Sequence, residues 1–159
     1  MNSIVVPVDG SEISLNALDV AADFARTLKS KLVVCHVVDV ARAAAMTYGE
    51  SQFVGGCLEA LRDEGRSIVQ IAADRLRPLA QGAETRLLEG APVEQILKIV
   101  EELHAAWIVM GSHGRSGLSR ALLGSVAEDV VRHAHVPVTI VPMRAHSQLP
   151  REASPKVAI

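Results

Sequence analysis

Short apolar runs alternate with amphipathic stretches along most of the chain. The apolar runs are rich in aliphatic residues and predict strands at 3–8, 31–38, 83–88, 106–110 and 136–141. Nearly unbroken runs of this kind are typical of strands that are buried on both faces of a sheet. The run at 83–88 instead alternates in polarity, which favours a sheet edge. Pro137 removes a ladder donor and therefore favours the start of a strand or an edge.

Apolar residues at helical spacing follow four of these runs. They predict helices over 11–28, 58–79, 92–103 and 125–133. Ser11 is suited to cap the first of these helices, and Pro92 is suited to the first turn of the third. Residues 39–57 lack this spacing and contain three glycines, so we expect a mobile surface excursion there, in which 41–45 could form a helical turn.

The alternation of strands and helices predicts a single α/β domain over residues 1–143. We expect a doubly wound sheet of five parallel strands with helices on both faces and right-handed crossovers. The strand order 3-2-1-4-5 is favoured by the position of the glycine-rich stretch described below, although spacing alone also allows 2-1-3-4-5. Residues 144–159 are polar and include two prolines, which predicts a disordered tail.

Composition narrows the class of protein. The chain of 159 residues is 49% hydrophobic but only 3% aromatic, which predicts an aliphatic core. A net charge of −2 does not support nonspecific binding to nucleic acid or to an anionic membrane, and no apolar run reaches the roughly 18 residues of a membrane span. Cys35 and Cys57 are too few for a disulfide framework and no secretory leader pattern is visible, so we expect a cytoplasmic setting.

The stretch 109–126 carries the most distinctive chemistry. It leaves a predicted strand, passes through four glycines and two arginines, and reaches Gly124-Ser125 directly before a predicted helix. Glycine lets backbone N–H groups approach a ligand closely, and a helix N-terminus offers unpaired donors and the positive end of the helix dipole. This combination predicts an anion site, most naturally for phosphate.

Several familiar motifs do not fit this stretch. The chain has no G-x-x-x-x-G-K-[ST] string, and its first loop carries only Gly10 where a dinucleotide fingerprint needs three glycines. Ser112 does not stand in a G-x-S-x-G context, so no Ser/His/Asp hydrolase is indicated. The histidines lack metal-site spacing, so no transition metal is expected.

The stretch instead shows Gly111-x-x-Gly114, nine residues, then Gly124-Ser125. This G-x-x-G-x(9)-G-[ST] pattern resembles that of the ATP-binding branch of the universal stress protein family, whose members usually do not bind ATP without it. The resemblance covers residues 3–142. It also includes the strings Val6-Pro7-Val8-Asp9-Gly10-Ser11, His36-Val37-Val38, Gly90-Ala91-Pro92 and Ile108-Val109-Met110-Gly111-Ser112-His113-Gly114-Arg115.

The resemblance implies a set of nucleotide-binding residues. They are Pro7, Val8, Asp9, Val37, Met110, Gly111, His113, Gly114, Arg115, Gly124, Ser125 and Val126. The glycines and the Gly124-Ser125 corner enclose the triphosphate, the backbone of Val37 meets the adenine edge, and Asp9 faces the ribose or a nucleotide-bound Mg²⁺. The apolar members of the set form walls around the base. On the residues alone, Asp9 could also cap the first helix, and Arg115 and Arg120 could be surface charges.

The implied function is the binding of ATP, together with Mg²⁺, by a nucleotide-responsive stress module with at most slow hydrolysis. No catalytic residue is assigned, because neither a general base nor a P-loop lysine is evident. Two alternatives remain open: an enzyme that acts on adenine nucleotides, and a nucleotide-independent interaction module. The apolar strand at 136–141 is expected at an edge and predicts a homodimer, in agreement with the antiparallel pairing of such strands in the family.

Overall fold

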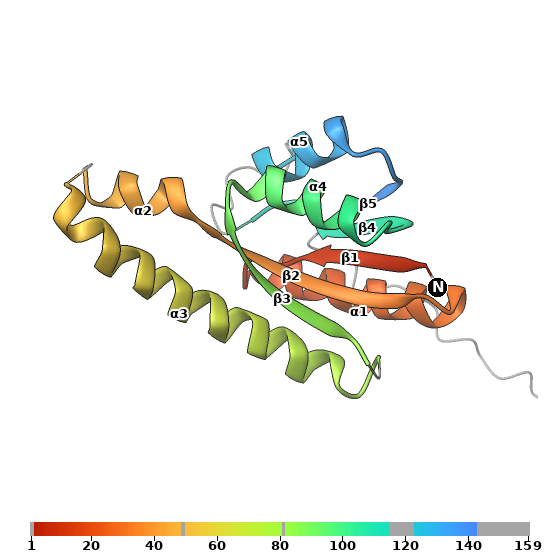
Figure 1. Ribbon diagram of the computed structural model, residues 1–159. Coiled ribbons are helices and arrows are strands. Elements are labelled where there is room, and N and C mark those ends of the chain that lie inside the picture. The colour runs from red at the N-terminus through yellow and green to blue at the C-terminus, as the bar shows by residue number, and fades with distance from the viewer. Residues whose placement is uncertain (1, 49, 81, 115–122, 143–159) are drawn as a thin grey trace, which may run out of the picture.

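The computed structural model describes residues 2–48, 50–80, 82–114 and 123–142, which form a five-stranded sheet between two layers of helices (Figure 1). The elements in chain order are β1 (Ser3–Pro7), α1 (Glu12–Leu28), β2 (Lys31–Asp39), α2 (Val40–Met46), α3 (Ser51–Leu76), β3 (Glu84–Gly90), α4 (Pro92–Glu102), β4 (Trp107–Gly111), α5 (Ser125–His133) and β5 (Val138–Val141). The tail predicted at 144–159 lies outside the described residues.

All strand pairs of this sheet are parallel, and the strand order is β3-β2-β1-β4-β5. The predicted doubly wound fold with order 3-2-1-4-5 is therefore confirmed. β3 and β5 occupy the two edges, as their sequence patterns predict. Pro137 stands just before β5, where its carbonyl accepts a hydrogen bond of 3.0 Å from the N–H of Ile108.

The sheet is buried on both faces by aliphatic side chains. In Figure 1, α1 and α3 cover one face, and α4 and α5 cover the other. Val34 packs among residues of α1 and α3, whereas its neighbour Val33 packs among residues of α4 and α5. Successive residues of a strand point to opposite faces, so a strand that is apolar at every position suits a sheet covered twice.

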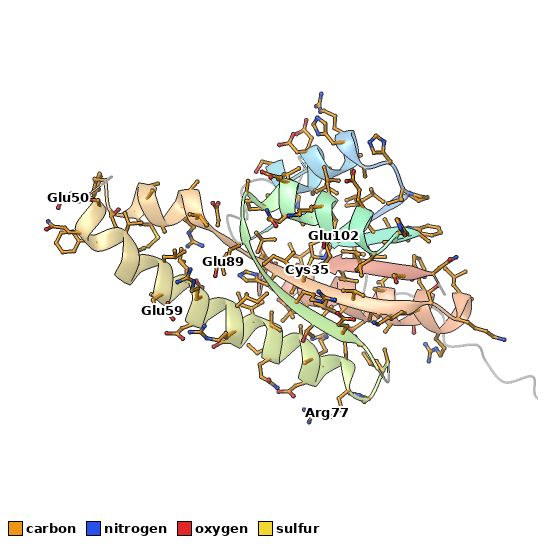
Figure 2. All side chains as sticks on the ribbon, in the orientation of Figure 1. Cys35, Glu50, Glu59, Arg77, Glu89 and Glu102 are labelled. Carbon is orange, nitrogen blue, oxygen red and sulfur yellow. The ribbon has the colours of Figure 1, made fainter. Side chains whose placement is uncertain are left out.

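The segment 39–57 differs from the predicted excursion, because most of it is helical, and the helical turn that was allowed at 41–45 lies within α2. Asp39 caps α2 by accepting a 3.2 Å hydrogen bond from the backbone N–H of Arg42. α3 then begins at Ser51, so the helix predicted to start at residue 58 starts earlier. Together, α2 and the first half of α3 form an arm that projects past the sheet, with Glu50 near its far end (Figures 1 and 2).

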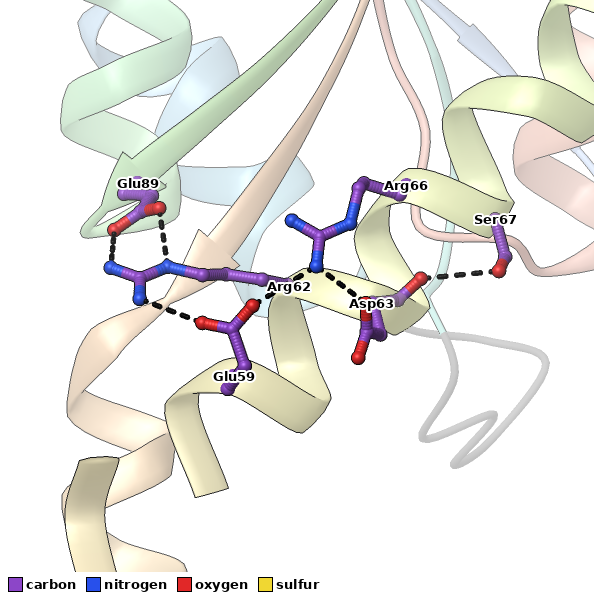
Figure 3. A network of polar contacts seen from close by, with 6 residues as sticks. All are labelled: Glu59, Arg62, Asp63, Arg66, Ser67 and Glu89. Carbon is purple, nitrogen blue, oxygen red and sulfur yellow. Dashed lines mark hydrogen bonds and ion pairs between the residues drawn. The ribbon is translucent and has the colours of Figure 1, made fainter. Parts of the chain in front are cut away.

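Gly55 and Gly56 lie inside α3, although glycines were expected to prevent a helix there. Each costs a helix about 1 kcal/mol relative to alanine. The tertiary structure offsets this cost, since α2 packs along this part of α3 and charged side chains tie the helix to the sheet. Arg62 makes a bidentate contact with Glu89 at the end of β3, at 2.8 and 2.9 Å, and also contacts Glu59 (Figure 3). None of the described helices, α3 included, combines the length and apolar character needed to cross a membrane.

Candidate functional site

A cavity of about 590 Å³ opens at the carboxyl ends of β1, β2 and β4. This is where the strand order reverses, the usual ligand site of open α/β sheets. Among the residues predicted to bind nucleotide, those that line the cavity are Pro7, Val8, Asp9, Val37, Met110, Gly111, His113, Gly114, Gly124, Ser125 and Val126. The remaining predicted residue, Arg115, lies outside the described part of the chain, as does Arg120.

The N-terminus of α5 faces this cavity, and no side chain of the described residues caps it. Gly124 is the cap residue, and the ladder begins with a 2.8 Å bond from the N–H of Glu128 to its carbonyl. Ser125, Val126 and Ala127 form the first turn and line the cavity, and the N–H groups of a first turn have no intrahelical acceptor. The N–H of Gly124 itself donates to the Ser112 carbonyl at 2.9 Å, which holds the helix start against the loop after β4. The cavity therefore meets several N–H groups that have no partner among the described residues, together with the positive end of the helix dipole.

The glycines of the loop permit close approach between elements. A Cβ on Gly111 would lie 3.0 Å from the side chain of Ile13, so β4 passes against the start of α1 with no room for a side chain. A Cβ on Gly114 would lie 2.7 Å from Oδ2 of Asp9, which joins the loops after β1 and β4 in one site. Both positions are thus glycine because of tertiary packing.

Asp9 does not cap α1, because Ser11 is the cap. The hydroxyl oxygen of Ser11 accepts a 3.2 Å bond from the N–H of Ser14. Asp9 instead accepts two bonds at Oδ1, one of 3.0 Å from the Ser11 N–H and one of 2.6 Å from the Ser11 hydroxyl. These bonds fix the carboxylate with Oδ2 toward Gly114. The alternative interpretation of Asp9 as a helix cap is therefore wrong.

Val37 offers both backbone groups to the cavity. The N–H of Val8 donates to the Cys35 carbonyl at 2.8 Å, so Cys35 faces the β1 side, and Val37, two residues later, faces the same side. If the parallel pairing of β1 with β2 continued past Val8, the Val37 N–H would donate to the Val8 carbonyl. That carbonyl instead accepts a 2.7 Å bond from Nδ1 of His36. In the described part of the chain, no backbone partner therefore meets Val37 on this side, and a donor and an acceptor stand side by side.

His113 is held by its neighbour in the loop. Its Nδ1 lies 3.0 Å from Oγ of Ser112, and its Nε2 is buried without a hydrogen-bond partner among the described residues. A buried ring nitrogen that lacks a partner is uncommon in folded proteins. The ring lines the cavity next to Gly114, at the wall that includes the start of α5.

Several cavity residues were not found from the sequence. They come from the end of β2, the arm and the start of α4, and are His36, Val38, Asp39, Arg42, Leu61, Glu64, Pro92 and Ile96. Nothing in the sequence marked the residues of the arm, because 39–57 was expected to be an irregular excursion. The helix periodicity around residues 58–79 placed Leu61 on an apolar face but did not say that this face reaches the cavity.

Cys35 also borders the cavity, but its thiol is inert. Its residue is fully buried at the centre of the sheet (Figure 2), and this burial raises the pKa of the thiol to about 12. Since the thiolate is the reactive form, Cys35 contributes packing and not nucleophilic chemistry.

Comparison with known proteins adds family relationships. The model of the universal stress protein family matches residues 1–142. A universal stress protein of Methanocaldococcus jannaschii, MJ0531, is 35% identical over 139 residues, which cover 87% of this chain and 80% of that protein.

Solved structures share the fold. Protein MJ0577 of the same organism superposes with a TM-score of 0.78 at 29% identity, covering 91% of this chain and 97% of that one. A universal stress protein in complex with cAMP gives a TM-score of 0.64 at 30% identity, with coverages of 89% and 96%. One from Archaeoglobus fulgidus in complex with dAMP gives 0.60 at 25% identity, with coverages of 89% and 98%.

Proposed function

This chain belongs to the universal stress protein family, and we propose that its cavity binds an adenine nucleotide, specifically ATP together with Mg²⁺. Bound nucleotide would make the protein a nucleotide-responsive stress module of the cytoplasm. Two relatives with the same fold are solved with cAMP and with dAMP, which supports an adenosine-phosphate ligand as the chemical class.

The observation that carries this proposal is the uncapped start of α5. Serine, threonine, aspartate or asparagine at the cap would accept a hydrogen bond from one of the free N–H groups of the first turn. This chain has Gly124 there, and the free donors line a cavity. An anionic ligand supplies the missing acceptors, and a triphosphate offers several of them.

The other end of the cavity suits the base. A backbone N–H beside a backbone C=O, as at Val37, complements the N1 acceptor and the N6 amino donor of adenine. Apolar side chains from several elements line the same cavity and would contact the faces of the ring, among them Val8, Leu61, Ile96 and Met110. The end of the cavity at Val37 thus suits the nucleobase, and the end at the start of α5 suits phosphate.

The carboxylate of Asp9 fits a nucleotide-bound Mg²⁺. Hard oxygen ligands are those that Mg²⁺ prefers, and proteins commonly hold it with one or two carboxylates plus the phosphates of the substrate. Oδ2 of Asp9 points to the glycine loop, while Oδ1 is bonded to Ser11. The ion would neutralise part of the triphosphate charge.

The cavity favours binding over rapid turnover. No lysine stands among its described lining residues, and its histidines are oriented by other bonds: His36 to the Val8 carbonyl, and His113 to Ser112. A phosphoryl-transfer site needs charge stabilisation and an oriented nucleophile. We therefore propose at most slow hydrolysis of ATP. Turnover on the order of 1 per second or faster would establish an enzyme instead.

Equilibrium titration with ATP and Mg²⁺ tests the proposal, with CTP as the control for base recognition. We expect saturable binding of ATP at one site and weaker binding of CTP. Mass spectrometry of small molecules released when the purified protein is denatured provides an independent check. A protein that neither releases a nucleotide nor binds added ATP would contradict the proposed function and favour an interaction module.

We also propose a homodimer through β5. This strand is at an edge of the sheet, and Val138 and Ile140 are only partly buried in the single chain. An apolar strand edge favours pairing with its own copy. Sedimentation velocity at micromolar concentration is expected to show a dimer, and a monomer there would contradict this part of the proposal.

A further inference from the structure

The arm brings an arginine to the base end of the cavity. α2 follows β2 without an intervening loop, so Arg42 lies in the first turn of α2, shortly after Val37. Its backbone N–H donates to Asp39, which fixes this turn over the end of the strand. Arg42 and Val37 both line the cavity, and Arg42 is an exposed residue.

Arg42 differs from the other arginines that the structure describes. Each of the others makes an ion pair with a carboxylate, and they are Arg26, Arg62, Arg66, Arg75, Arg77, Arg86 and Arg132. In the same part of the chain, no carboxylate pairs with Arg42. Its guanidinium is therefore available to a ligand in the cavity that it lines.

The surrounding charges indicate which part of the ligand this group meets. Asp39 lines the cavity together with Arg42 and accepts the backbone N–H of Arg42, and this carboxylate disfavours a phosphate at the same end. The unpaired N–H groups that suit phosphate are at the start of α5. An uncharged, planar group fits beside Arg42 better, because a guanidinium stacks on aromatic faces and on nucleobases.

We propose that Arg42 is a specificity-determining residue whose guanidinium plane covers the exposed face of the nucleobase that meets the backbone of Val37. This inference rests on the proposed function, since it requires a nucleotide in the cavity. The sequence region that looked like an irregular excursion thereby supplies a wall of the base site. Stacking favours a large purine ring over a pyrimidine.

Titration of ATP into wild type, Arg42→Ala and Arg42→Lys tests this role. Loss of the stacked guanidinium is expected to raise the dissociation constant of ATP roughly three- to fivefold in Arg42→Ala. Arg42→Lys should bind ATP as weakly as Arg42→Ala, because an ammonium group keeps the charge but loses the plane. Arg77→Ala, which removes an exposed arginine of comparable size away from the cavity, is the matched control and should bind as wild type does.

Repeating the titrations at low and high salt separates stacking from charge. Arg42→Lys keeps the charge, so a stacked guanidinium gives a ratio of the Arg42→Lys and wild-type dissociation constants that is the same at both salt concentrations, whereas a phosphate contact that needs the arginine fork gives a ratio that shrinks as salt rises. Full rescue by lysine, a salt-dependent ratio, or unchanged binding by Arg42→Ala would each overturn this inference while ATP binding itself stands. Failure of wild type to bind ATP would overturn the proposed function and this inference with it.

Discussion

Gly124→Asp separates the stability of the fold from the binding of phosphate. Backbone angles of φ −64° and ψ 148° at this cap position suit any residue, so aspartate introduces no backbone strain. A new Cβ would lie 3.3 Å from Cα of His113, which requires a shift of only a few tenths of an ångström. Aspartate is also a good N-cap and gains a few tenths of a kcal/mol over glycine. We expect the free energy of unfolding to stay within about 0.5 kcal/mol of wild type.

Binding of ATP should change far more than stability. The new carboxylate would accept hydrogen bonds from the first turn of α5 and so remove donors from the phosphates. Two unit charges 4 Å apart near a protein surface repel by about 4 kcal/mol, and allowing half of this to be screened leaves about 2 kcal/mol. Since about 1.4 kcal/mol corresponds to a factor of ten, the dissociation constant should rise at least about 30-fold.

Two further variants resolve this effect into its parts. Gly124→Asn caps the helix without adding charge, so it should weaken binding by only about tenfold, the value of one or two hydrogen bonds. Gly55→Asp places the same side chain in open space on α3 and should leave ATP binding unchanged. Isothermal titration gives the dissociation constants, and chemical denaturation gives the stabilities. A stable Gly124→Asp protein with wild-type affinity would refute the assignment of phosphate to the start of α5.

Three other predictions concern stability and reactivity. Gly65→Ala should lower the free energy of unfolding measured in urea, because its Cβ would lie 2.8 Å from a leucine methyl of β3 and 2.9 Å from a histidine ring of β2. Gly56→Ala, whose Cβ would lie in open space, should instead raise the free energy of unfolding by up to about 1 kcal/mol. The pKa of Glu84 is held below its usual 4.5, chiefly by a hydrogen bond from a lysine of β2. Ionised Glu84 therefore stabilises the fold at pH values above 4.5, and this contribution is lost as the pH falls through the lowered pKa. Glu84→Gln should therefore lose less stability than wild type when thermal unfolding is followed from pH 5 downward, and equal losses would contradict this. A thiol reagent should modify Cys57 in the native protein but Cys35 only after unfolding, so early modification of both would show that the sheet centre opens readily.

Much of the fold follows from local pattern. The apolar runs predict all the strands, and the alternation in 83–88 and the position of Pro137 indicate the edges of the sheet. Ser11 and Pro92 stand at the helix starts where their chemistry places them. These predictions hold because caps, breakers and buried strands depend on residues close in sequence.

The arm shows where local pattern fails. Gly55 and Gly56 argue against a helix, yet α3 runs through both, because packing against α2 and the contact of Arg62 with Glu89 are tertiary contacts that local spacing does not show. Intrinsic propensity is a weak predictor where tertiary contacts of this kind exist. The missed helix is also the reason that no residue of the arm was predicted in the site.

The sequence by itself determined the elements, the α/β class and the glycine spacing of the loop after β4, since each depends on residue type and local order. Only the tertiary structure decided what these parts surround. It turned the start of α5 toward the Asp9 loop, and in the described part of the chain it left the N–H and C=O of Val37 without a backbone partner on the β1 side. It also brought Arg42 to the cavity that Val37 lines. A binding site is a property of surfaces that meet in space, and the packing of the sheet and helices sets which surfaces those are.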